Sequence, residues 1–154
     1  MTSSDATPDD LIALTRDFFE RHWPAAPGRS PVWLQLDPRD LSAGLDAGGC
    51  YAVADPNQRL LYVGLALAER QPSKPTARGG VIRRLYRHVV RRGALTKGQI
   101  VPKRTTWVEQ GGIGSIWVLL FPADFSYLAA GLEVFLIQAL SGKLPVNKSR
   151  VRAG

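Results

Sequence analysis

The chain has 154 residues and carries 20 Lys or Arg against 13 Asp or Glu, a formal net charge of +7 at pH 7. This length suits one domain with its own core, and the hydrophobic content of 45% excludes a disordered tail. The excess of positive charge favours a polyanionic partner such as nucleic acid. With one cysteine and two histidines, the sequence excludes an intramolecular disulfide and argues against a structural zinc site.

The N-terminal segment MTSSDATPDD is polar and acidic, which is the opposite of a secretory signal. No apolar run approaches the length of a membrane span. We therefore expect a soluble cytoplasmic protein with no membrane partner.

Residues 1–47 are expected to form an extension, a helix plus a short strand, that packs on the main domain. Thr7-Pro8-Asp9-Asp10 indicates the helix start, because it combines an N-cap hydroxyl, a proline in the first turn and two acids near the positive end of the dipole. Apolar residues then recur with helical spacing at Leu11, Ile12, Phe18, Phe19 and Trp23. A short strand is predicted at 32–36 and a helical turn at 38–45, and nothing in this part indicates chemistry.

The stretch from Gly49 to Gly64, GCYAVADPNQRLLYVG, predicts a β-hairpin. Strands are expected at 51–54 and 60–63, and the connecting DPNQ favours a turn through its proline and Asx side chains. Residues near the outer ends of two antiparallel strands lie roughly opposite each other, so Tyr51 and Tyr62 are expected to present two phenols on one surface. Tyrosine is a common strand residue, and the hairpin by itself is more typical of ordinary half-buried side chains.

Gly79-Gly80 precedes VIRRLYRHVVRR, which predicts a helix with an apolar stripe at Ile82, Leu85, Tyr86 and Val89. The side chains of Arg83, Arg84, Arg87, His88 and Arg91 fall on its other side. Residues 71–108 include ten Lys or Arg and no Asp or Glu, and self-repulsion makes such a surface costly unless an anion binds it. The following segment, 93–106, is expected to be a loop that carries Lys97, Lys103 and Arg104.

Residues 115–121, SIWVLLF, predict a central strand, and Asp124 is a candidate N-cap for a helix over 125–140. This helix is apolar almost all round and is therefore expected to be buried. It carries one charge, Glu133, and a buried carboxylate is costly unless it is paired, protonated or bound to a cation. Arg84, through a structural salt bridge, and a divalent metal are the two candidate partners, and the sequence leaves both open.

Taken in order, these pieces resemble the GIY-YIG endonuclease superfamily over about residues 48–150. They are GCY and YVG, then an arginine with a histidine one helical turn later (Arg84 and His88), then Glu133 in an apolar helix, and finally PVN at 145–147. Cys50 and Val63 stand where the name motifs have isoleucine, which leaves both tyrosines in place. Arg83 competes with Arg84 for the arginine position, but only Arg84 keeps a histidine four residues later.

The resemblance implies an α/β (α+β) fold in which residues 48–154 form a nuclease domain, with a small three-stranded, mainly antiparallel sheet flanked by helices. It also implies hydrolysis of a phosphodiester with one divalent cation, Mg²⁺ or Mn²⁺, held by Glu133. By position, Tyr51 orients or deprotonates the attacking water, and Tyr62 contacts the water, the metal shell or the phosphate. Arg84 neutralises the scissile phosphate, His88 carries a proton or contacts the phosphate, and Asn147 fixes the site through hydrogen bonds. The general base, Tyr51 or His88, stays open.

The expected function is therefore a DNA endonuclease of restriction-like or repair-like type, with RNA an open alternative substrate. Gly64 is expected to leave room for the DNA backbone, and the side chains that would grip DNA are those of Arg83, Arg87, Arg91, Lys97, Lys103, Arg104 and Lys148. A sequence-specific cutter of this size is expected to work as a homodimer on a symmetric site. The alternatives are a non-catalytic nucleic-acid-binding module that has kept the fold, and a basic protein that binds acidic partners.

Overall fold

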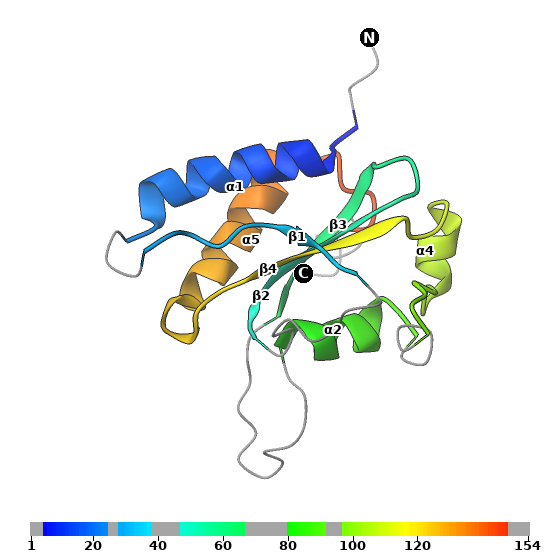
Figure 1. Ribbon diagram of the computed structural model, residues 1–154. Helices are drawn as coiled ribbons and strands as arrows, with labels where there is room; N and C mark the ends of the chain where they lie inside the picture. Colours follow the sequence, from blue (N-terminus) through cyan, green and yellow to red (C-terminus); the bar gives the residue numbers. More distant parts are fainter. Residues whose placement is uncertain (1–4, 25–27, 38–46, 67–79, 92–96, 148–154) are drawn as a thin grey trace.

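One antiparallel sheet organises the computed structural model, which describes residues 5–24, 28–37, 47–66, 80–91 and 97–147 (Figure 1). Its strands are β1 (Leu34–Gln35), β2 (Gly49–Ala54), β3 (Leu60–Ala66) and β4 (Ser115–Leu120). They lie in the order β1-β4-β2-β3, and every neighbouring pair is antiparallel. The fold is thus mixed α+β, as the sequence predicts.

The predicted count of three strands is wrong, because the N-terminal extension supplies a fourth. Leu34 and Gln35 of β1 pair with Val118 and Trp117 of β4, which makes β4 an interior strand. Without β1, the outer backbone groups of β4 would lack these partners, and unpaired backbone groups at a sheet edge invite unwanted association. The extension therefore completes the same sheet. The helical turn predicted at 38–45 lies entirely outside the described residues.

Helices cover both faces of the sheet (Figure 1). On one face lie α1 (Pro8–His22) and α5 (Tyr127–Ala139), which contact each other, and α5 also contacts β2 and β3. On the other face lies α2 (Gly80–His88), which contacts the same two strands. The buried strand β2 contributes side chains to the hydrophobic cores on both faces of the sheet. Cys50 and Ala52 belong to the core beneath α1 and α5, whereas Tyr51 and Val53 belong to the core beneath α2.

The first helix begins as its sequence predicts. The backbone N–H of Thr7 donates to Oδ2 of Asp10 at 2.9 Å, and the backbone N–H of Asp10 donates to Oγ1 of Thr7 at 3.4 Å. This reciprocal capping satisfies two backbone donors at the start of α1. Leu11, Phe18 and Phe19 then turn into the core.

The turn of the β2–β3 hairpin is also confirmed. Oδ1 of Asp55 accepts hydrogen bonds from the backbone N–H groups of Asn57 and Arg59, each at 2.9 Å. Its Oδ2 lies 3.4 Å from Nε of Arg59, and Gln58 takes a left-handed conformation with φ 64°. The turn is therefore fixed by an Asx side chain, and both strands extend further than predicted, back to Gly49 and on to Ala66.

Two differences from the sequence prediction follow α2. The helix ends at His88 instead of continuing through VVRR, because Val90 forms a bridge with Pro102 and the backbone of Arg91 donates to Val101. The predicted loop then gives way to a short helix, α4 (Thr105–Glu109), whose Trp107 is buried.

The last helix is less buried than its composition predicts. Asp124, the predicted N-cap of the last helix, lies inside a 3₁₀ turn, η1 (Ala123–Phe125), so that prediction is wrong. The N-cap of α5 is Ser126, whose side chain makes no capping hydrogen bond. Leu132 and Leu136 face the core, whereas the side chain of Val134 is 53% exposed. Only one side of this helix is therefore buried, although its sequence is apolar on almost all sides.

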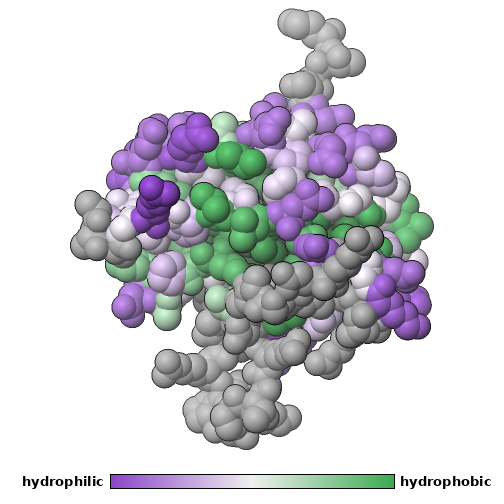
Figure 2. All heavy atoms as spheres, viewed as in Figure 1, coloured by the Kyte–Doolittle hydropathy of each residue, from purple (hydrophilic) through white to green (hydrophobic). Residues whose placement is uncertain are grey.

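Figure 2 shows one side of the molecule, in the orientation of Figure 1. Hydrophilic side chains cover the region of α1, and a band of hydrophobic side chains crosses the middle of the view. The large exposed hydrophobic side chains of the protein include Val32 and Leu34, at the strand that forms one edge of the sheet.

Candidate active site

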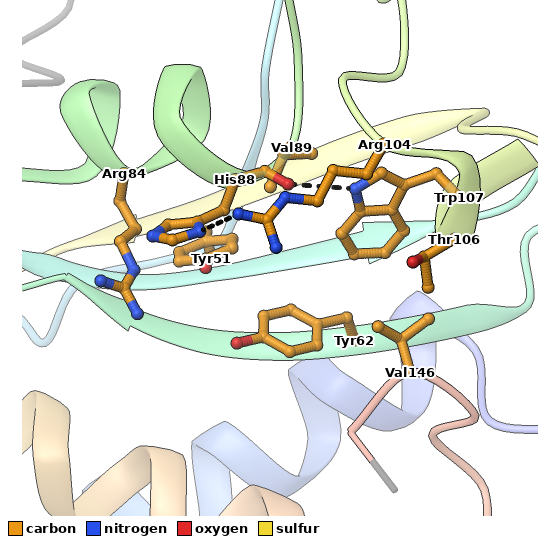
Figure 3. A pocket seen from close by; sticks show the side chains of 9 residues that line it. All are labelled: Tyr51, Tyr62, Arg84, His88, Val89, Arg104, Thr106, Trp107 and Val146. Carbon is orange, nitrogen blue, oxygen red and sulfur yellow. Dashed lines mark hydrogen bonds between the residues drawn. The ribbon is translucent and has the colours of Figure 1, made fainter. Parts of the chain in front are cut away.

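The two tyrosines of the hairpin lie on the same face of the sheet, as predicted, but not directly opposite each other. In the register of β2 and β3, Tyr51 pairs with Gly64 and Val53 pairs with Tyr62. Tyr51 and Tyr62 are therefore diagonal neighbours, with ring centroids 5.8 Å apart. They line a hollow of about 320 Å³ on the face of the sheet that α2 covers (Figure 3).

Gly64 has a role that the sequence did not indicate. A Cβ atom at this position would lie 2.5 Å from Cζ and 2.6 Å from the hydroxyl of Tyr51, and 2.6 Å from Cε1 of Tyr62. The space above Gly64 is thus taken by the two phenol rings themselves. This close packing is sufficient reason for a glycine, and the expected approach of a DNA backbone to Gly64 stays a prediction.

Helix α2 places Arg84 and His88, one turn apart, on the lining of the same hollow. Both side chains are partly buried, and Nε of Arg84 is buried without a hydrogen-bond partner among the described residues. Arg83 does not line the hollow. Of the two arginines that compete by sequence, Arg84 is therefore the one that faces the tyrosines.

The remaining lining comes from Arg104, which the sequence predicts as a DNA contact, and from residues that sequence reasoning missed as parts of the site: Val89, Thr106, Trp107 and Val146. Arg104 was expected to grip DNA, but its Nη2 lies 3.3 Å from Nδ1 of His88 (Figure 3). The indole Nε1 of Trp107 donates to the backbone oxygen of His88 at 3.2 Å. A lone tryptophan in the polar stretch TTWVEQ was the available signal, since such a residue often anchors a short segment to the core.

A lysine also ties the segment before α4 to the end of α2. Nζ of Lys103 donates to the backbone oxygen of Tyr86 at 2.7 Å, and the backbone N–H of Lys103 donates to the backbone oxygen of Val89 at 2.8 Å. A cation at the C-terminal end of a helix also meets the negative end of its dipole. These bonds, together with that of Trp107, hold Arg104 beside His88.

The hollow disfavours charge on its phenol and imidazole. Burial raises the pKa of the Tyr51 phenol well above its usual value, Tyr62 raises it further, and Arg84 acts in the opposite direction without outweighing burial. Burial also lowers the pKa of His88, and the charges of Arg84, Arg104, Arg87 and Lys103 lower it further. At neutral pH both groups are therefore in their neutral forms.

Glu133 lies on α5 and does not line the hollow. Its side chain as a whole is partly exposed, but the Oε2 atom of its carboxylate is buried, in line with the buried carboxylate that the sequence predicts. Burial raises the pKa of the Cys50 thiol, and the charge of Glu133 raises it further. This effect of Glu133 on Cys50 indicates that its carboxylate lies near the start of β2.

Asn147 is fully engaged with the outer edge of β3. Its Oδ1 accepts from the backbone N–H of Val63 at 2.9 Å, and its Nδ2 donates to the backbone oxygen of Val63 at 3.0 Å. The backbone N–H of Val146 donates to Leu61 at 3.0 Å. The hydrogen bonds of Asn147 therefore hold β3, the strand that carries Tyr62, in place.

Most of the predicted DNA-contacting side chains are accessible. Those of Arg87, Arg91, Lys97, Lys103 and Arg104 are exposed, and that of Arg83 is partly buried. Lys148 lies outside the described residues.

Within the described ranges, no three His, Cys, Asp or Glu side chains gather where they could hold a metal ion. The helices in this part of the chain are also too short or too polar to cross a membrane. The chain was compared with protein-family models, curated proteins and solved structures, and none of them matches it.

Proposed function

We propose that this chain is a DNA endonuclease that hydrolyses phosphodiester bonds with the help of one divalent cation, on a GIY-YIG-like fold. The observation that carries the proposal is the convergence of Tyr51, Tyr62, Arg84 and His88 on one hollow. These are the side chains that the family resemblance pairs with the reaction, and they come from two separate elements, the hairpin and α2.

Phosphate recognition is the first task of such a site. Hydrogen bonds from a guanidinium to phosphate oxygens are charge-assisted and are stronger than those between neutral groups. The buried Nε of Arg84 has no hydrogen-bond partner in the described structure, so a phosphate oxygen would satisfy a donor that is otherwise costly to bury. Arg104 adds a second guanidinium to the same lining.

Positioning of the attacking water is the second task. In the hydrolysis, the water oxygen bonds to phosphorus, the bond from phosphorus to the leaving oxygen breaks, and the water loses a proton while the leaving oxygen gains one. Tyr51 is protonated at neutral pH, because burial raises the pKa of its phenol. Its hydroxyl is therefore suited to orient the water through a hydrogen bond, as the first of the two roles expected for it.

Glu133 is the side chain to which the proposal assigns the cation. Mg²⁺ in proteins often uses one or two carboxylates together with substrate phosphates and several waters, so a single carboxylate can suffice for a site shared with a phosphate. The choice of Glu133 rests on the family resemblance, because its side chain lies on α5 and does not line the hollow. A cation held by the protein alone does not fit, since no larger acidic cluster occurs in the described ranges. When bound, the cation supplies positive charge that stabilises the phosphorane-like transition state and makes a nearby water more acidic.

A plasmid-nicking assay with added Mg²⁺ tests the proposal. We expect the unmodified protein to convert supercoiled plasmid to nicked or linear forms, and Glu133→Ala and Arg84→Ala to lose at least about 100-fold in rate, a typical size for the loss of one electrostatic contact to the transition state. Glu20→Ala, which removes an exposed carboxylate from α1, is the matched control. Equal cleavage by the unmodified protein and Glu133→Ala would remove the cation from the proposal.

The second candidate function is a nucleic-acid-binding module without catalysis. Residues 71–108 contain ten Lys or Arg and no Asp or Glu, and this excess of positive charge is sufficient for binding nucleic acid without cleaving it. This candidate predicts that DNA binding survives while no plasmid, branched DNA or RNA is cut under any metal condition. A protein that instead binds acidic partners in general would show little dependence of DNA affinity on salt.

A further inference from the structure

The bond between Arg104 and His88 determines which ring nitrogen of the histidine carries a proton. Nη2 of Arg104 lies 3.3 Å from Nδ1 of His88. A guanidinium is charged at all ordinary pH values and can only donate hydrogen bonds. Nδ1 must therefore accept, and in a neutral imidazole the proton then resides on Nε2.

The other ring nitrogen faces an environment of donors. In Figure 3 it points away from Arg104, toward the side of the hollow where the guanidinium of Arg84 lies. Nε of Arg84 is buried and has no hydrogen-bond partner within the described chain. An N–H of His88 and the Nε–H of Arg84 would thus point into the same space, which an acceptor such as a phosphate oxygen would fill, whereas the guanidinium of Arg84 already hydrogen-bonds the phenol of Tyr51.

We propose that Arg104 is a positioning residue that holds His88 as a neutral hydrogen-bond donor to a phosphate oxygen, so that His88 is not the general base. This inference rests on the proposed function and decides one of its two open assignments. His88 then acts beside Arg84 in binding the phosphate, and Arg104 acts through His88 in addition to any contact of its own with DNA.

The charges around His88 agree with this role. Arg84 and Arg87 lie on its own helix, and Lys103 and Arg104 lie on the segment that packs against the end of α2. Tyr51 and Tyr62 face it from the sheet, and both line the same hollow. No carboxylate lines this hollow, so the described surroundings hold His88 below its ordinary pKa of 6.5.

Nitrogen-15 NMR of the free protein tests the assignment without any substrate. The chain has two histidines, so His22→Gln identifies the His88 signals. We expect Nε2 to be protonated and Nδ1 to show the shift of a hydrogen-bond acceptor at pH 7.5. In Arg104→Met, the Nδ1 signal should lose this acceptor shift and the pKa of His88 should rise, whereas Lys97→Met, which removes an exposed charge from the same loop, should change neither.

Protonation of Nδ1 in the unmodified protein would overturn the inference. An unchanged Nδ1 signal and pKa in Arg104→Met would do the same. Because this measurement needs no cleavage, it gives its answer even if the protein proves not to be a nuclease.

Cleavage kinetics test the catalytic consequence. His88→Ala should lower the rate by about 10- to 100-fold, the usual effect of losing a hydrogen bond to a charged group. His88→Gln should recover at least tenfold of that loss, because its amide N–H reaches about as far as Nε2 yet cannot take up a proton. A general base would instead give losses of about 100- to 10,000-fold that are equal in both variants, and that result would exclude the donor role.

Discussion

At the scale of single residues, the site depends on the absence of a side chain as much as on the side chains present. The phenol of Tyr51 is 1% exposed and lies over Gly64, on the neighbouring strand. The sequence placed a glycine after the second tyrosine but gave no sign that the first tyrosine would occupy the space above it. This contact depends on strand register, which one pair of residues cannot specify by itself.

Gly64→Ala should disrupt this packing. Its methyl group would lie 2.5–2.6 Å from atoms of Tyr51 and Tyr62, and forcing extra volume into a packed site typically costs about 1–3 kcal/mol. Urea unfolding should show a lower free energy of unfolding by that amount. Gly131→Ala on α5 is the control, because the new Cβ would lie 3.5 Å from Phe18 and the helix would gain about 0.5–1 kcal/mol of stability.

His88 should make the stability of the protein fall in acid. Burial and nearby cations lower its pKa in the folded protein, whereas the unfolded chain keeps the ordinary value of 6.5. Between these two pKa values the unfolded state binds more protons, so this contribution to stability is complete above pH 6.5 and is lost as the pH falls through the folded pKa. Urea unfolding from pH 8 to pH 5 should show a smaller loss in His88→Gln, while identical pH profiles would contradict the assignment.

At the scale of elements, β3 is the strand that needs protection, because it lies at an edge of the sheet and carries Tyr62. Residues 145–147 cover this edge through Val146 and Asn147. Such cover satisfies backbone groups that would otherwise be open to another chain.

Asn147→Ala should therefore loosen β3. The change leaves the backbone N–H and oxygen of Val63 without their side-chain partner, and each buried group left unsatisfied costs about 1–3 kcal/mol. Hydrogen exchange of the Val63 amide should accelerate, and the free energy of unfolding should fall. The exposed Gln138→Ala on α5 should change neither quantity, and an unchanged Val63 exchange rate in Asn147→Ala would show that the side chain of Asn147 does not protect this edge.

The elements differ in how far their sequences reveal them. A capping box marks α1, a turn flanked by apolar runs marks the β2–β3 hairpin, and the run at 115–121 marks β4, because each signal is local. The helix α4 has five residues, too few for a periodic pattern, and it is held by Trp107 through a distant backbone oxygen. For the same reason Arg104 could not be connected to His88, since tertiary structure alone brings them together.

At the scale of the whole molecule, charge is distributed unequally between the two sides of the sheet. The chain carries a net charge of +7. On the side of α2, the described residues within 80–91 and 97–104 include seven Lys or Arg and no Asp or Glu: Arg83, Arg84, Arg87, Arg91, Lys97, Lys103 and Arg104. The opposite side carries α1, with acids in its first turn. A polyanion would therefore approach from the side of α2 and the hollow.

Replacing one arginine on each side tests this direction. Arg87 is exposed on α2, and Arg16 is exposed on α1, which packs with α5 on the other face of the sheet. Each phosphate contact contributes about −0.9 to the slope of log affinity against log salt for duplex DNA, so Arg87→Ala should make the slope shallower by about 1. Arg16→Ala should leave the slope unchanged, although both variants lose the same formal charge. Fluorescence anisotropy with a labelled DNA duplex, at salt concentrations from about 50 to about 200 mM, measures the slopes of both variants. Equal slopes in the two variants would mean that net charge, and not the α2 face, attracts the DNA.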